Sequence, residues 1–276
     1  MKFDFTRPII FVCIVMAVFI IVFPLVWIVL NSFKYFRDII TLNIFNSNWT
    51  ITNYETVLIS REENIIHQLL NSIFYVITTL LLVIPLSLLA GYGLARSHHS
   101  SMFKILAINL LVFSRIIPSV SIAVPYFVIF KLINIYDTPL ALVIVYSLKV
   151  LPLSIFMIMT FIEEVPIEVE EAASIDGASL FLTLRKIVIP LILPGLAATA
   201  IFSFINTWND YIFAAFLAGK NSANLQIAIA QFNAEYFVRW GELCAALIIG
   251  IAPVLIFTII AQKYLVRGLT LGAIKG

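Results

Sequence analysis

The sequence predicts an all-α membrane protein with six transmembrane helices, and three observations carry that prediction. Of the 276 residues, 62% are hydrophobic and only 12% are charged, whereas soluble domains carry about 25% charged residues. The mean hydropathy is +1.07. A bilayer core about 30 Å thick needs about 20 apolar residues in a helix. The sequence has six such runs, at approximately 9–31, 68–94, 103–131, 138–161, 195–218 and 241–264.

The first run resembles a signal peptide in one respect, because Lys2 and Arg7 precede its apolar core. It is more than 20 residues long and has no small-x-small cleavage pattern. We therefore interpret 9–31 as an uncleaved first span. The polar residues in 32–67 predict a structured external loop.

The third run is too long for one straight crossing. It contains Pro118 and Pro125, and proline interrupts the hydrogen bonds of a helix. We expect residues 103–131 to cross the membrane, kink, and continue as a helix near the outer surface.

Charge sets the expected orientation. With both termini in the cytoplasm, the inner segments carry nine Lys and Arg residues and the outer segments carry six. The positive-inside rule favours this orientation by a modest margin. Residues 264–276 then form a cytoplasmic tail.

Several function classes find no support in the sequence. A formal net charge of +2 is too small to predict nucleic-acid binding. No G-x-x-x-x-G-K-[ST] loop is present, so the chain is not expected to hydrolyse ATP. His67, His98 and His99 lack metal-ligand spacing, and no catalytic triad is evident. We predict no catalytic residue, no metal site and no cofactor bound by this chain.

Acidic residues concentrate between the fourth and fifth spans, where six of the fifteen fall within positions 163–176. Pro166 suits the first turn of a helix, and Gly177 suits a left-handed terminating position. Ser179 can cap a second helix. This pattern predicts a short helix at about 167–176, a turn and a second helix on the cytoplasmic face. A purely connecting segment, kept soluble by its charge, is the alternative.

A polar cluster interrupts the fifth apolar run. Amide and carboxylate groups exchange hydrogen bonds with sugar hydroxyls, and aromatic faces pack on pyranose rings. Polar residues inside a membrane often mark a solute pathway, although they also bridge helices within a bundle. The candidate pathway residues are Asn206, Trp208, Asn209, Asp210 and Tyr211.

Two isolated cations, Arg115 and Lys149, fall in the third and fourth runs. They can snorkel to the interface, pair with a carboxylate, or face an aqueous cavity. A pairing of Lys149 with Asp210 is a specific hypothesis.

The acidic segment also resembles a known motif. Glu171-Ala172-Ala173, followed by Gly177, Ile187 and Pro190, resembles the EAA loop of ABC importer permeases. The strings "EAASIDGAS", "FINTWNDYIFA" and "YLVRGLTLGAIKG" are similar to those of maltose-type, carbohydrate-uptake permeases. The resemblance covers nearly the whole chain.

That resemblance implies an ABC type I importer permease fold, with a cytoplasmic coupling loop at 163–190. The implied function is ATP-driven uptake of a carbohydrate across a bacterial or archaeal cytoplasmic membrane. The implied partners are a homologous second permease, two ATPase subunits and an external solute-binding protein, with lipid around the spans. ATP and Mg²⁺ would belong to the partner ATPase.

The resemblance also assigns residues. The ATPase-coupling set is Glu170, Glu171, Ala172, Ala173, Ile175, Asp176, Gly177, Ala178, Ile187 and Pro190. The set for a contact between the tail and the ATPase is Arg267, Gly268, Thr270, Gly272 and Lys275.

Other functions stay open at this stage. The cargo of an ABC permease with this sequence could instead be a polyol, a glycerol phosphate or another polar solute. A secondary transporter would need internal repeats and a buried coupling-ion carboxylate, and Asp210 is the one carboxylate well inside a span. A structural scaffold would leave both polar clusters without a role. The sequence does not name the sugar.

Overall fold

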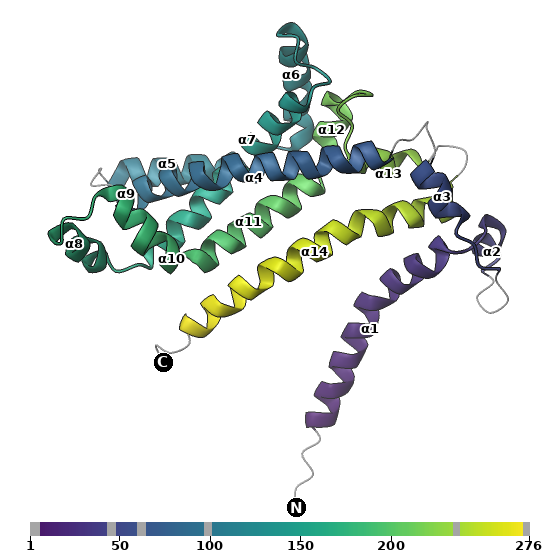
Figure 1. Ribbon diagram of the computed structural model, residues 1–276, viewed down its shortest axis with the longest axis horizontal. Coiled ribbons are helices and arrows are strands. Elements are labelled where there is room, and N and C mark those ends of the chain that lie inside the picture. Colours follow the sequence, from purple (N-terminus) through teal and green to yellow (C-terminus); the bar gives the residue numbers. More distant parts are fainter. Residues whose placement is uncertain (1–5, 43–47, 60–64, 97–100, 234–237, 273–276) are drawn as a thin grey trace, which may run out of the picture. The chain divides into compact units, whose positions relative to one another are not determined.

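The computed structural model describes residues 6–42, 48–59, 65–96, 101–233 and 238–272, and every named element among them is a helix (Figure 1). The chain divides into two compact units. One comprises residues 1–67 and 228–252, and the other comprises residues 68–227 and 253–276.

The first unit contains α1 (Thr6–Ser32), α2 (Phe36–Ile40) and α3 (Thr52–Ile59). The apolar part of α1 is exposed from residue 10 to residue 26, whereas Asn31 and Ser32 at its end are buried. The segment after α1 is ordered by Asn53. Its Nδ2 donates hydrogen bonds to the carbonyls of Ser32 (2.9 Å) and Lys34 (2.9 Å).

The second unit is built around α4 (Ile65–Arg96), α7 (Pro139–Glu163) and α11 (Leu193–Trp208). Gly91 lets α4 approach α7 closely, since a Cβ there would lie 3.0 Å from the backbone nitrogen of Met159. Small residues permit such approaches between membrane helices.

The third apolar run is interrupted, as its prolines predict. It forms α5 (Ser101–Phe113) and α6 (Ser119–Leu132), and Pro118 occupies the N-cap of α6 in an extended conformation. The break falls before Pro118, while Pro125 lies inside α6. Neither helix alone has the about 20 residues that a crossing needs.

The fifth apolar run, predicted as a span at approximately 195–218, is not one continuous helix. Helix α11 ends at Trp208, and α12 (Ile212–Leu217) follows. The Asp210 carboxylate accepts a hydrogen bond from the backbone of Phe213 (2.9 Å), and Asn224 Nδ2 donates to the Asp210 carbonyl (2.6 Å). These contacts satisfy backbone groups that the break releases, which irregular backbone at membrane depth requires.

The acidic segment has the predicted form. Helix α8 (Ile167–Ile175) ends before Gly177, whose φ is +82°, and the Ser179 hydroxyl accepts a hydrogen bond from the Leu182 backbone (3.4 Å). The second arm comprises α9 (Leu180–Thr183), a π-helical turn η1 (Leu184–Val188) and α10 (Ile189–Leu191). It meets α11 at a bend of 77°.

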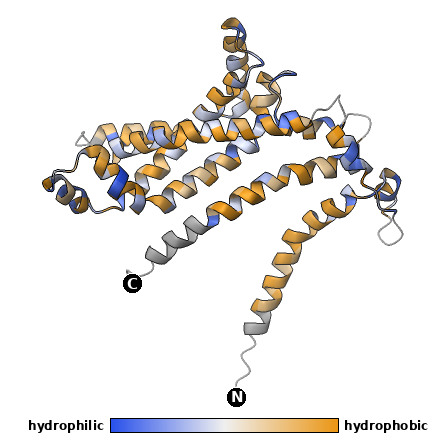
Figure 2. Ribbon diagram, in the orientation of Figure 1, coloured by the Kyte–Doolittle hydropathy of each residue, from blue (hydrophilic) through white to orange (hydrophobic). Residues whose placement is uncertain are grey.

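Four described helices are long and apolar enough to cross a membrane, or five if the bent pair Leu180–Leu191 and Leu193–Trp208 is one span. In Figure 2, hydrophobic residues predominate along α1 and along the coloured part of the last helix. The last of the four belongs to α14, which follows the short α13 (Leu225–Gln231) and runs from Trp240 to Gly272. The helical backbone thus extends past residue 264. The side chains of Arg267 and Thr270 are not described, and Lys275 lies outside the described residues.

Candidate functional site

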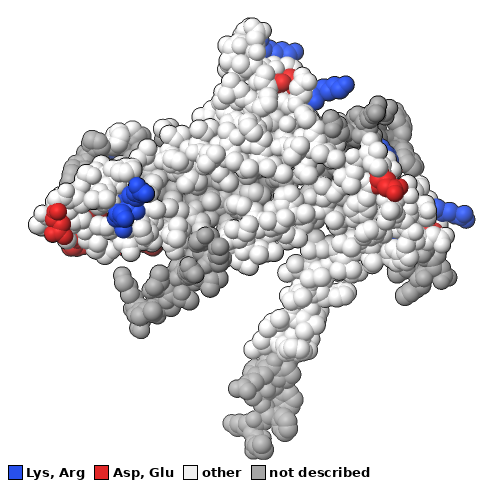
Figure 3. All heavy atoms as spheres, viewed as in Figure 1, with Lys and Arg blue, Asp and Glu red and all other residues white. Residues whose placement is uncertain are grey.

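The first candidate site is the exposed face of α8 and of the arm that follows. Ile175 is 86% exposed, and Leu180 and Phe181 are 61% and 71% exposed. Figure 3 shows acidic side chains over α8 and basic side chains over the neighbouring arm, where Arg185 and Lys186 are exposed. This surface combines protruding apolar side chains with charges of both signs, as protein-binding surfaces do.

The ten predicted coupling residues divide by exposure. Those on the open surface are Glu171, Ala172, Ile175, Asp176, Gly177 and Pro190. Ala178 and Ile187 are half-buried, and Glu170 and Ala173 are buried. One side of α8 is therefore exposed, and the chain itself covers the other side.

Glu170 is held inside the chain by an ion pair and a hydrogen bond with Arg96 and by a hydrogen bond from Tyr92. Arg96 Nη2 lies 2.7 Å from Glu170 Oε1, and Arg96 Nε lies 2.9 Å from the same oxygen. The Tyr92 hydroxyl donates to Glu170 Oε2 over 2.6 Å. Arg96 also donates to the carbonyls of Ile162 (3.0 Å) and Val165 (2.7 Å). One guanidinium thus joins the end of α4, the end of α7 and the buried side of α8.

The second arm is anchored by apolar packing. Leu184 and Val188 of η1 are buried against Ile158 and Ile162 of α7. A π-helical turn accommodates one extra residue and is frequent at functional sites. Here it places Leu184 in the core while Arg185 remains at the surface.

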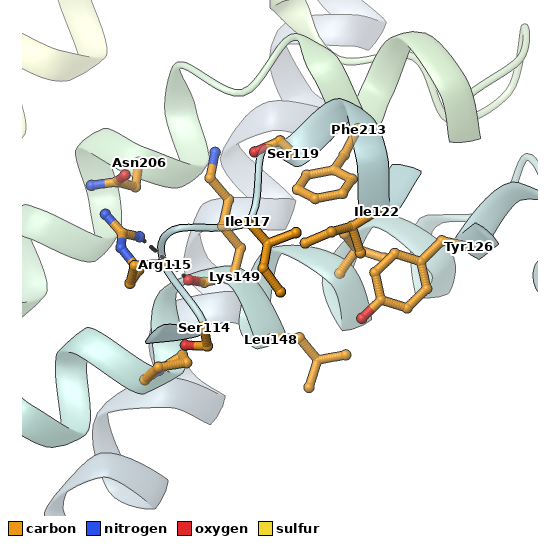
Figure 4. A pocket seen from close by; sticks show the side chains of 12 residues that line it. Ser114, Arg115, Ile117, Ser119, Ile122, Tyr126, Leu148, Lys149, Asn206 and Phe213 are labelled. Atoms are coloured by element: carbon orange, nitrogen blue, oxygen red, sulfur yellow. Dashed lines mark hydrogen bonds between the residues drawn. The ribbon is translucent and has the colours of Figure 1, made fainter. Parts of the chain in front are cut away.

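The second candidate site is a cavity of about 530 Å³ between the α5–α6 break, α7 and the α11–α12 break. Figure 4 shows side chains from these segments turned toward one space. Half of the twelve lining residues are polar or charged: Ser114, Arg115, Ser119, Tyr126, Lys149 and Asn206.

Lys149 and Asp210 form an ion pair, with 2.6 Å between Nζ and Oδ2. This confirms the pairing that the sequence suggested. The Asp210 side chain is only 2% exposed, while that of Lys149 is 23% exposed. The pair therefore presents its ammonium side to the cavity and keeps its carboxylate behind the wall.

Arg115 has a different environment. Its Nη1 donates a long hydrogen bond (3.4 Å) to the Lys149 carbonyl, and its Cζ lies 5.3 Å from the centre of the Phe202 ring. Figure 4 shows the guanidinium beside Asn206. Within the described part of the chain, no carboxylate pairs with Arg115.

The five predicted pathway residues do not gather in one place. Asn206 lines the cavity, and Asp210 contributes to it through Lys149. Trp208 is 3% exposed and stacks on Phe204, while Asn209 and Tyr211 are exposed away from the lining.

Sequence reasoning missed several residues that organise these sites. Tyr92 and Arg96 were visible only as polar residues at the end of an apolar run, and their partner lies more than 70 positions away. Asn224 and Gln226 hold the carbonyls of Asp210 (2.6 Å) and Trp208 (3.1 Å) at the α11–α12 break. They stand in a short polar stretch that carried no motif.

Asp137, before α7, was also missed. Its carboxylate accepts hydrogen bonds from the backbones of Gly219 (2.7 Å) and Ser222 (3.0 Å), from the Ser222 hydroxyl (2.7 Å) and from Asn221 Nδ2 (3.0 Å). Partial burial alone would raise the pKa of Asp137, but these hydrogen bonds outweigh it and lower the pKa below the ordinary aspartate value.

Three relatives resemble this chain over almost its full length. It is 32% identical to the sulfoquinovosyl glycerol transport system permease protein SmoH of Agrobacterium fabrum, over 92% of this chain and 89% of that protein. It is 32% identical to the trehalose transport system permease protein SugB of Mycobacterium tuberculosis, over 92% of each. It is 31% identical to the trehalose/maltose transport system permease protein MalG of Thermococcus litoralis, over 95% of this chain and 94% of that protein.

A solved structure shares the fold. A chain of a bacterial ABC transporter involved in import of the acidic polysaccharide alginate superposes with a TM-score of 0.77 at 20% identity, over 96% of this chain and 98% of that one. Residues 83–271 match the family described as binding-protein-dependent transport system inner membrane components. The match includes α8, its flanking helices and every residue of the cavity lining. The chain therefore belongs to the family of binding-protein-dependent transport system inner membrane components.

Proposed function

We propose that this chain is one permease subunit of an ATP-driven ABC importer and that its cargo is a carbohydrate delivered by an external solute-binding protein. The observation that carries the proposal is the full-length similarity to permeases named for sulfoquinovosyl glycerol, trehalose and maltose. The cavity supports it, because hydroxyl, amide and aromatic side chains suit a saccharide.

The exposed side of α8 is the proposed contact with an ATPase subunit. Glu171, Ala172 and Ile175 would enter a cleft on that subunit, and Glu170 would hold the opposite side of the helix to the permease. Closure of two ATPase subunits on ATP and Mg²⁺ would then move α8 and the membrane helices attached to it. The tail residues Gly268 and Gly272 are a second proposed contact.

The proposed topology has six spans and both termini in the cytoplasm. Helices α5 and α6 together would make the third crossing, and the segments around the α11–α12 break would make the fifth. Helix α8 would then lie between the fourth and fifth spans on the cytoplasmic side. The exposed apolar surface of α1 would face lipid and a homologous second permease.

The test begins with affinity purification of the chain from detergent-solubilised membranes, followed by an ATPase assay with the binding protein and candidate sugars. We expect an ATPase and a second permease to co-purify, and one loaded sugar to stimulate hydrolysis. Stimulation by the binding protein loaded with a polyol or a glycerol phosphate would support the importer function and identify a different cargo. Isolation of the chain alone, with solute flux insensitive to ATP, would favour a secondary transporter and overturn the proposal.

A charge-reversing variant tests the contact itself. Glu171→Lys should release the ATPase subunit while leaving recognition by the binding protein unchanged. Glu164→Lys makes the same charge change on an exposed carboxylate outside α8, and it should retain the ATPase. Equal retention by both variants would remove Glu171 from the proposed contact.

A further inference from the structure

We propose that the cavity binds an acidic saccharide and that Arg115 receives its carboxylate, sulfonate or phosphate group. This inference rests on the proposed importer function and narrows its cargo from carbohydrates in general to those that carry an oxyanion. It concerns the described residues of the α5–α6 break, α7 and the α11–α12 break.

The charge of the cavity is the first argument. Its lining contains two cations, Arg115 and Lys149, and no carboxylate. Asp210 neutralises Lys149 from behind the wall, where its other oxygen is occupied by the backbone N–H of Phe213. The described part of the cavity therefore carries one surplus positive charge.

The position of that charge is the second argument. A guanidinium among apolar membrane segments is costly unless it faces water or a partner. Arg115 has five N–H donors. In the described structure one of them donates a long hydrogen bond to the Lys149 carbonyl, and the guanidinium lies near the Phe202 ring. Arg115 lines the cavity, its other N–H groups have no hydrogen-bond acceptor among the described residues, and the fork of its donors matches planar oxyanions.

The remaining lining suits the sugar part of such a ligand. Asn206 lies beside the guanidinium, Ser114 and Ser119 add hydroxyl groups elsewhere in the lining, and Tyr126 and Phe213 offer aromatic rings (Figure 4). Hydroxyls and amides exchange hydrogen bonds with sugar hydroxyls. A volume of about 530 Å³ lies within the usual range of small-molecule sites.

The test compares two ligands that differ only at C6, methyl β-D-glucuronide and methyl β-D-glucoside. Their equilibrium binding is measured on the assembled transporter in nanodiscs, without the solute-binding protein, so that the membrane cavity alone selects. We expect the glucuronide to bind roughly tenfold more tightly, which corresponds to about 1.4 kcal/mol. The preference should shrink as salt is raised.

Substitutions test whether the preference for the glucuronide depends on Arg115. Arg115→Gln should bind both glycosides equally, and Arg115→Lys should keep part of the preference because it keeps the charge. Lys220→Gln removes one positive charge from an exposed loop outside the cavity, and it should behave like the wild type.

Several results would overturn the inference. One is that the wild type binds the two glycosides equally or binds neither. Another is that Arg115→Gln retains the preference for the glucuronide. Loss of the second permease from the Arg115→Gln complex, with no anion preference in Arg115→Lys, would instead assign Arg115 to a subunit contact. ATP-driven uptake of neutral sugars in any of these cases would leave the importer function standing, whereas ATP-insensitive flux would remove that function itself.

Discussion

Arg96 and Glu170 form an ion pair whose atoms are 2.7 Å apart and whose side chains are 14% and 9% exposed. Arg96 ends the 32-residue helix α4, and Glu170 lies on the buried side of α8. With the Tyr92 hydroxyl on the other carboxylate oxygen, the pair fixes α8 against the membrane helices. A force applied to α8 by a partner would pass directly into α4.

Removing one member of this pair should damage both stability and coupling. Arg96→Ala leaves Glu170 buried without its counter-charge, which we expect to cost about 3 kcal/mol of unfolding free energy. Sugar-stimulated ATP hydrolysis should fall more than basal hydrolysis. Thermal unfolding in detergent and an ATPase assay on the assembled complex would measure the two effects.

An exposed ion pair in the same region provides the control. Lys104 and Glu163 are 2.5 Å apart, with side chains 33% and 38% exposed. Lys104→Ala should cost less than about 1 kcal/mol, because solvent screens such pairs. Equal losses in the two variants would contradict a special role for Arg96.

Gly177 should be replaceable only by residues that accept a left-handed backbone. A Cβ at this position would have nothing within 4 Å, so space is not the constraint, but φ is +82°. Gly177→Val should cost about 1–2 kcal/mol and reduce coupling. Gly177→Asn should be milder, because asparagine enters this conformation more readily. ATPase association and uptake measured for both variants would decide, and identical behaviour would refute the backbone explanation.

Lys149 and Asp210 should be energetically coupled. Lys149→Met leaves a buried carboxylate, and Asp210→Asn leaves an unpaired ammonium but retains an oxygen that can accept from the Phe213 backbone. We expect the double variant to be more stable than the sum of the single losses by about 0.5–3 kcal/mol. Measuring the free energy of unfolding of the wild type and the three purified variants completes this double-mutant cycle. Strict additivity would show that the pair contributes no coupling energy.

Asp137 should make the stability of the loop at residues 219–222 depend on pH. Its pKa is lowered in the folded state, so its contribution is present above the ordinary aspartate pKa and is lost as pH falls through the folded value. Asp137→Asn should therefore destabilise the protein at pH 7, and the difference from the wild type should shrink at strongly acidic pH. Unfolding at several pH values tests this.

Glu164→Gln, on an exposed carboxylate, is the control and should show no such trend. Gly219→Ala should mimic the loss at neutral pH, since its Cβ would lie 2.7 Å from Asp137 Oδ2. A pH-independent difference for Asp137→Asn would contradict the role assigned to its charge.

The features predicted correctly from sequence are those with local causes. Pro166, Gly177 and Ser179 define α8 and its turn through backbone preferences of single residues. Four of the six apolar runs coincide with described helices that are long and apolar enough to cross a membrane, because that property depends only on length and composition. These signals act over a few positions or over composition, and they do not depend on the partner segment.

The features that escaped prediction depend on residues distant in sequence. The break after Trp208 is held by Asn224 and Gln226, which lie on a later segment. Glu170 looked equivalent to Glu171 until the fold placed Arg96 beside it, 74 positions away. Identifying such partners requires the tertiary structure, because many polar residues were equally available to each of them.

The Lys149–Asp210 pair also constrains the order in which the protein can be made. Lys149 is synthesised 61 residues before its counter-ion, a delay of roughly 3 to 12 s at the usual rate of translation. Insertion of α7 before Asp210 is synthesised would place a lone ammonium in the bilayer, at a cost of about 2.5–3.5 kcal/mol at a helix centre. In that order of events, insertion of α7 would rely on its apolar residues, and neutralisation of Lys149 would be a later, separate step of biogenesis.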